Sequence, residues 1–165
     1  MINELTLIDT IVVPQGAEYQ AVCRGLNKAN MNVRVVSIPI GMNDIEEIIN
    51  NSIRSSSSIA IAGLCGSLSK QYSVGDVVLY QDCWNLKGDR VYSDRELNFK
   101  IQQKLGIDLV SGLSCDRIIH RATEKLNLSK TYPVKVVDMA ITFLQQPIAA
   151  IRLIIVILNR KHMNI

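Results

Sequence analysis

Long basic runs, paired cysteines and membrane-length apolar stretches are all missing from this sequence. Its 18 Lys and Arg against 15 Asp and Glu leave a net charge of only +3, without the basic patch typical of nucleic-acid-binding proteins. Aromatic residues make up 5%, so stacking platforms for bases are not expected. The most apolar segment, residues 147–158, contains Arg152 and is too short to span a bilayer. We therefore expect neither a nucleic-acid nor a membrane partner.

The four cysteines stand far apart, at positions 23, 65, 83 and 115, and never form CxxC. Each lies beside apolar neighbours, so the sequence predicts reduced, buried thiols and neither a zinc site nor a disulfide framework. The amino terminus carries Glu4 and lacks the basic start of a signal peptide, which favours a cytoplasmic location. A chain of 165 residues that is 48% hydrophobic predicts one domain with a substantial core, over residues 1–165.

Short β-branched runs alternate with amphipathic segments along the chain. Strands are expected at residues 8–14, 33–38, 59–62, 77–80, 109–113, 134–137 and 148–158. Helices are expected at residues 17–26, 43–53, 93–105, 121–128 and 140–146, and the polar residues 82–89 predict a loop. Strands that alternate with helices predict an α/β sandwich with a largely parallel sheet.

Two glycine-containing breaks stand out as candidate ligand loops. Residues 63–67 (GLCGS) follow an apolar strand, and two glycines let a ligand approach the main chain closely. An ordinary tight turn explains the same glycine pair equally well. Residues 14–16 (PQG) lead from a strand into a helix N-terminus, where unsatisfied backbone N–H groups suit an anion.

Four short stretches, taken in order, resemble the purine nucleoside phosphorylase and nucleosidase family. They are residues 13–18 (VPQGAE), 63–68 (GLCGSL), 75–78 (GDVV) and 136–139 (VVDM). The resemblance implies a three-layer α/β sandwich around a mixed, largely parallel central sheet that is partly barrel-like. It also implies cleavage of the N-glycosidic bond of purine nucleosides or methylthioadenosine-like substrates by phosphate or water. Homo-oligomers are common in the family and are expected here too.

The resemblance also assigns the residues of a small-molecule nucleoside site. Leu64, Cys65 and Gly66 would line the base and ribose, and Met139 would pack against the ribose. Gly16 resembles the amino-terminal loop that meets phosphate or the catalytic water. No metal and no cofactor is implied, apart from phosphate as a co-substrate.

Several charged residues admit both a functional and a structural interpretation. Arg24 and Arg117 are candidates for binding phosphate, although each also suits a salt bridge. Asp138 would orient the site or simply cap a helix, and His120 suits a surface position better than a general acid. Cys65 has no identifiable partner base, which argues against a nucleophilic role.

Two departures from the family pattern predict strongly reduced or absent turnover. The family's glutamate after Met, which holds the ribose hydroxyls, is replaced by Ala140. The family's Ser-Asp pair, whose Asp protonates the purine, is replaced within residues 153–158 (LIIVIL), and the chain stops earlier than its relatives. No catalytic residue is therefore assigned. The alternatives are a non-catalytic nucleoside- or nucleotide-binding remnant, or an interaction protein that uses the apolar C-terminal segment.

A truncated gene, or a reading-frame change near Ala140 or Arg152, is our hypothesis for this shortened C-terminus. The hypothesis predicts that the downstream DNA encodes the missing Ser-Asp segment in another frame. A long intergenic region without such a segment would contradict it.

Overall fold

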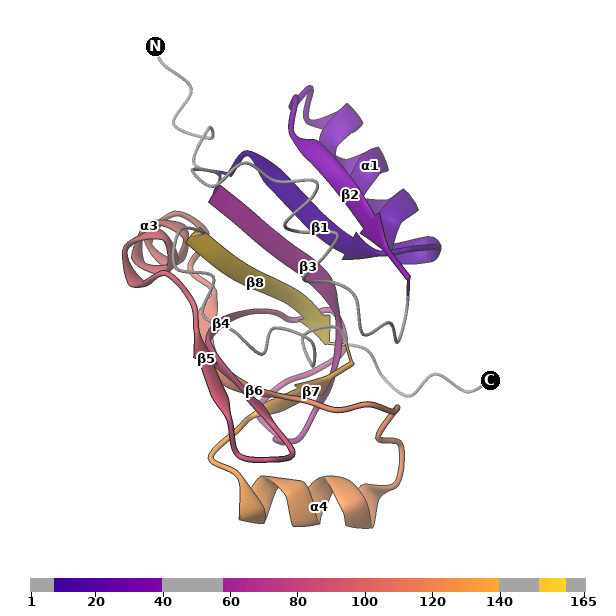
Figure 1. Ribbon diagram of the computed structural model, residues 1–165, viewed down its shortest axis with the longest axis vertical. Helices are drawn as coiled ribbons and strands as arrows, with labels where there is room; N and C mark the ends of the chain where they lie inside the picture. Colours follow the sequence, from indigo (N-terminus) through magenta and orange to yellow (C-terminus); the bar gives the residue numbers. More distant parts are fainter. Residues whose placement is uncertain (1–7, 40–57, 140–151, 160–165) are drawn as a thin grey trace.

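The computed structural model describes residues 8–39 and 58–139, together with the backbone of residues 152–159. Its first unit is the expected strand, helix and strand: β1 (Thr10–Pro14), α1 (Ala17–Lys28) and β2 (Arg34–Ile38). The two strands pair in parallel, and α1 lies against them (Figure 1). The predicted helix at residues 43–53 lies outside the described residues, as do the predicted helix at 140–146 and residues 148–151.

Strand β3 (Ser58–Ser67) pairs in parallel with β1 and is longer than the sequence predicted. The prediction of a glycine loop at residues 63–67 is wrong, because this segment continues strand β3. Backbone partners on other strands explain the difference: β8 (Arg152–Asn159) pairs with β3 as far as Cys65, and β7 (Val136–Asp138) pairs at Gly66 and Ser67. These hydrogen bonds outweigh the weak strand propensity of glycine.

Strand β4 (Val77–Asn85) likewise continues through part of the polar segment predicted to be a loop. It pairs in parallel with β6 (Asp108–Ser114), with an irregularity between Tyr80 and Asp82, and in antiparallel with β5 (Arg90–Tyr92). The prediction of a loop is therefore wrong for residues 82–85, and β5 is a strand that the sequence did not predict. A bulge shifts the side-chain alternation, which lets polar residues occupy a paired strand.

The two helices in the second half of the chain agree with the sequence prediction to within three residues. Helix α3 (Arg95–Leu105) begins after Asp94, whose carboxylate accepts the Leu97 N–H at 2.8 Å, and ends at Gly106 in the left-handed region (φ 63°). Helix α4 (Ala122–Thr131) follows β6 and leads back to β7. Neither these helices nor α1 is long and apolar enough to cross a membrane.

The described strands form one mixed sheet, and part of it closes into a ring. Strand β8 pairs in parallel with β3 and in antiparallel with β4, while β7 and β6 link the same two strands on the other side (Figure 1). The ring therefore runs β3, β8, β4, β6, β7 and back to β3. Its interior holds the main apolar core, which includes Ile59, Ile61, Val78, Val110 and Val136. The α/β class and the mixed, partly barrel-like sheet are thereby confirmed.

Candidate functional site

The antiparallel pairing of β3 and β7 separates the candidate site residues onto two faces. Gly66 lies opposite Val137 in this pairing. Side chains alternate along a strand, so Gly66 and Val137 share one face while Cys65 and Asp138 share the other. Cys65 belongs to the core cluster inside the ring, which makes that side the inner face. Val137 packs in a cluster with Leu128 of α4, which makes the Gly66 side the outer face.

The predicted nucleoside-binding residues divide between these faces. Leu64 lies two residues before Gly66 and therefore shares the outer face. Met139 directly follows β7 at a bend, next to Asp138 in the chain. Both side chains are half-buried. The Cys65 side chain is buried on the inner face, so a ligand on the outer face would meet only its backbone.

Gly16 is the one predicted phosphate or water residue that the topology brings to this region. It lies between β1 and α1 with φ 96°, a conformation that favours glycine. Because β1 and β3 are parallel, their carboxyl ends lie at the same edge of the sheet. Gly16 and the segment from Leu64 to Gly66 therefore approach the same edge, which is where ligands bind in open α/β sheets.

The two predicted arginines lie elsewhere. Arg24 is exposed on α1, roughly 12 Å along the helix axis from Gly16. Arg117 is exposed after β6, and its guanidinium makes an ion pair and two hydrogen bonds with Glu124 of α4. These hydrogen bonds raise the pKa of Arg117 and lower that of Glu124. Arg117 therefore makes a salt bridge, which was the structural alternative to binding phosphate.

A buried carboxylate on the inner face fixes the end of β7. Asp138 is only 4% exposed, and it accepts hydrogen bonds from Tyr80 Oη at 2.8 Å and Ser114 Oγ at 2.9 Å. Its carbonyl oxygen accepts the Cys115 N–H at 2.8 Å. Burial, followed by the charge of Asp138, raises the pKa of Tyr80 well above its ordinary value. Asp138 thereby joins β4, β6 and β7 immediately before Met139.

Gly112, which was not among the predicted site residues, makes room for this arrangement. A Cβ at position 112 would lie 2.1 Å from Cε2 of the Tyr80 ring. The ring is fully buried and its hydroxyl group is bound to Asp138, so a shift of the ring would break that contact. An isolated glycine within a predicted strand is a signal of such close approach, and it was available from the sequence.

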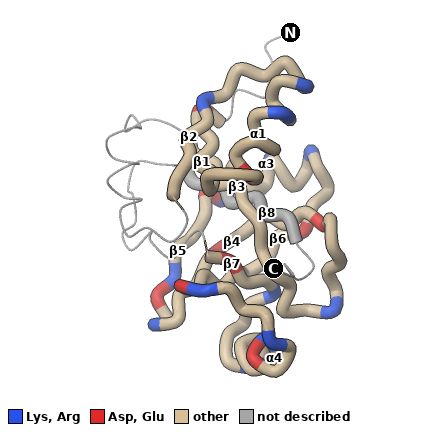
Figure 2. The backbone as a smooth tube through the Cα atoms, turned by 90° about the vertical axis from the view of Figure 1, so that its right-hand side faces the viewer, with Lys and Arg blue, Asp and Glu red and all other residues tan. Residues whose placement is uncertain are grey.

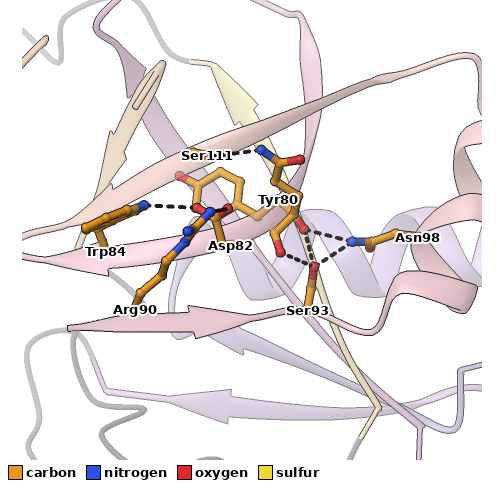
Figure 3. Close-up of polar contacts among 8 residues, drawn as sticks. Tyr80, Asp82, Trp84, Arg90, Ser93, Asn98 and Ser111 are labelled. Atoms are coloured by element: carbon orange, nitrogen blue, oxygen red, sulfur yellow. Dashed lines mark hydrogen bonds and ion pairs between the residues drawn. The ribbon is translucent and has the colours of Figure 1, made fainter. Parts of the chain in front are cut away.

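A second polar cluster holds the β4–β5 hairpin together (Figure 3). The buried carboxylate of Asp82 accepts hydrogen bonds from Arg90 Nη2 at 2.6 Å and from Trp84 Nε1 at 3.1 Å. The Arg90 guanidinium lies 5.0 Å from the centroid of the Trp84 ring and 4.6 Å from that of Tyr92. These contacts neutralise the buried charge within the hairpin, so this cluster stabilises the fold.

A smaller network connects α3 to β4. Ser93 Oγ donates to the Tyr80 carbonyl at 2.5 Å, and Asn98 Nδ2 donates to the same carbonyl at 3.1 Å (Figure 3). These bonds hold the backbone of Tyr80 from outside the ring, while its hydroxyl group is held inside by Asp138. Both ends of Tyr80 are therefore anchored.

We expect the buried thiols to make the protein sensitive to alkaline pH. Burial, with the Asp138 charge second, raises the pKa of Cys65 to about 12, and the same causes raise those of Cys83 and Cys115. An unfolded thiol ionises near pH 8.5, so the stability that these groups contribute is complete below about pH 8.5 and falls as the pH rises. For Cys65 alone the loss is about 1.4 kcal/mol per pH unit until its folded-state pKa is reached.

Urea denaturation between about pH 8 and pH 10, with reductant, measures this slope. Cys65→Ala, which removes a buried thiol, should make the decline shallower. Equal slopes in the wild type and Cys65→Ala would contradict the prediction.

Within the described ranges, no group of three or more His, Cys, Asp or Glu side chains is arranged to hold a metal ion.

The sequence matches no protein-family model and no curated protein, but the fold matches solved nucleosidases. The Campylobacter jejuni 5′-methylthioadenosine/S-adenosyl homocysteine nucleosidase superposes with a TM-score of 0.73 at 10% identity, over 96% of this chain and 87% of that chain. A mutant futalosine hydrolase from Helicobacter pylori gives 0.69 at 12% identity, over 92% and 90%. A mutant of the Helicobacter pylori nucleosidase, with 5′-methylthioadenosine in its active site, gives 0.68 at 13%, over 92% and 84%. The expected nucleoside phosphorylase type of fold is confirmed.

Proposed function

We propose that this chain, which has the fold of the nucleosidases, binds purine nucleosides or methylthioadenosine-like nucleosides and cleaves their N-glycosidic bond slowly or not at all. The observation that carries the proposal is the pairing of Gly66 with Val137. This register brings Leu64 and Gly66 to the outer face beside the end of β7, where Met139 follows, although these residues lie far apart in the sequence. The bound 5′-methylthioadenosine in a structure of the same fold supports a nucleoside as the ligand.

Weak turnover follows from the groups that the reaction needs. Cleavage of the glycosidic bond builds positive charge on the sugar and negative charge on the base, so an anion and a proton donor must face the ligand. Ala140 supplies neither, and the segment at residues 153–158 has no ionisable side chain. The nearby carboxylate of Asp138 lies on the inner face, where Tyr80 and Ser114 bind it. It is directed away from a ligand on the outer face.

Two measurements on the purified chain test this function. Calorimetry with adenosine and methylthioadenosine should give saturable binding. Chromatographic detection of adenine, with and without phosphate, should give a rate at least about a thousandfold below that of an active nucleosidase measured alongside. A comparable rate would refute the impaired activity, and the absence of any nucleoside binding would refute the site.

A pair of methionine variants tests whether Met139 contacts the bound nucleoside. Met139→Ala should weaken nucleoside binding roughly tenfold, because a thioether that packs on the ligand is removed. Met31→Ala, at a half-buried position after α1, is the matched control and should bind like the wild type. If the two variants bind equally, Met139 does not contact the nucleoside.

A further inference from the structure

Lys125 of α4 lies over the outer face at Gly66. A Cβ at position 66 would be 3.5 Å from Lys125 Nζ, 3.9 Å from its Cε and 3.6 Å from Cγ1 of Val137. Lys125 precedes Leu128 by three residues and therefore shares its helix face, the one that packs in the Val137 cluster. The half-buried lysine thus points toward β3 and β7, at the glycine expected to line the nucleoside.

The charge of this lysine has no counter-ion within the part of the chain that the structure describes. Salt bridges and hydrogen bonds there involve other cations, and the adjacent Glu124 carboxylate is bound through both oxygens by Arg117. Figure 2 shows α4 nearly end-on, with acidic and basic positions side by side. A cation without a described counter-ion favours an anionic ligand, because charge-assisted hydrogen bonds are stronger than neutral ones.

The electrostatic influence of Lys125 extends to the strand beneath it. Burial and the Asp138 charge both raise the pKa of Cys65, and the Lys125 charge opposes them. The other acidic groups near this site face away from the lysine or are bound already: Asp138 lies on the inner face, and Glu124 pairs with Arg117. An anion on the outer face at Gly66 would therefore meet a positive charge without a competing carboxylate among the described residues.

We propose that the Lys125 ammonium group and the adjoining side-chain-free backbone at Gly66 form an anion subsite of the nucleoside site. The subsite accepts a phosphate or carboxylate group, either as free inorganic phosphate next to the sugar or as an acidic group carried by the nucleoside itself. The nucleoside part of this inference rests on the proposed function, whereas the anion part stands on the position of Lys125 alone. Glycine at position 66 lets the ammonium group pack close to the backbone, since a Cβ there would be in van der Waals contact with Nζ.

Calorimetry on wild type, Lys125→Gln and Lys130→Gln tests the subsite, with adenosine, adenosine monophosphate and inorganic phosphate as probes. Lys130 is exposed in the last turn of the same helix and is the matched control. The wild type should bind adenosine monophosphate more tightly than adenosine. This preference should fall about tenfold in Lys125→Gln, the effect of losing one charge-assisted hydrogen bond, and should persist in Lys130→Gln.

The probes separate the two sources of the anion. If inorganic phosphate binds on its own, and more weakly to Lys125→Gln, the ligand of the subsite is free phosphate. If phosphate alone does not bind and only adenosine monophosphate is preferred over adenosine, the ligand is an acidic group on the nucleoside. An unchanged preference in Lys125→Gln, or equal weakening of all probes, overturns the subsite. Lys125-dependent phosphate binding without any adenosine binding would refute the proposed function and leave the subsite standing. Adenosine binding without a Lys125-dependent anion preference would refute the subsite and leave the proposed nucleoside binding standing.

Discussion

Gly112→Ala is expected to destabilise the protein by about 3 kcal/mol or more, which lowers its melting temperature by about 10 °C. The new methyl carbon would lie 2.1 Å from Cε2 and 2.3 Å from Cζ of Tyr80, far inside van der Waals contact. The ring cannot move aside, because its hydroxyl group is bound to Asp138 and its backbone carbonyl to Ser93 and Asn98. Thermal and urea denaturation measure the loss.

Gly25→Ala is the matched control for this substitution. Gly25 lies in α1, where a Cβ would meet nothing within 4 Å. Alanine is the better helix former, so this variant should be more stable than the wild type by about 0.5–1 kcal/mol. The same change in residue type therefore has opposite signs at the two positions. A Gly112→Ala variant as stable as the wild type would show that Tyr80 does not fill the ring interior as described.

Asp138→Ala is the second variant with a large expected effect, a loss of about 3 kcal/mol. It removes the acceptor of two buried hydroxyl groups, those of Tyr80 and Ser114, and leaves a void inside the ring. It should also weaken nucleoside binding, since Met139 follows the released end of β7. Urea denaturation gives the first quantity, and calorimetry with adenosine gives the second.

The chain contains a solvent-exposed counterpart of this contact. Tyr72 Oη donates to Asp108 Oδ2 at 3.1 Å on the surface, the same chemistry as the buried Tyr80–Asp138 bond. Asp108→Ala should cost about 0.5 kcal/mol or less, because water replaces the lost partner. Equal losses from the two aspartate variants would show that burial does not strengthen the Asp138 contact. A double-mutant cycle between Tyr80→Phe and Asp138→Ala isolates the energy of that one bond.

The sequence by itself determined the alternation of strands and helices, because that order depends on local chemistry. The Asp94 cap and the left-handed Gly106 fix the bounds of α3 through contacts within a few residues. The strand, turn and helix around Gly16 follow in the same way from a β-branched run, a proline and a glycine. Four short motifs that resemble the nucleoside phosphorylase and nucleosidase family, in the same order, also predicted the type of fold. The superposition on solved nucleosidases confirms it.

Only the tertiary structure decided which segments pair and which side chains share a face. Residues 63–67 and 82–85 carry glycine or polar side chains, which locally favour loops, yet they form strands because distant segments satisfy their backbone hydrogen bonds. Strand β8 closes the ring from a position about ninety residues after β3 in the sequence. Lys125 reaches Gly66 only through the packing of α4 on that ring, and no local pattern encodes this contact.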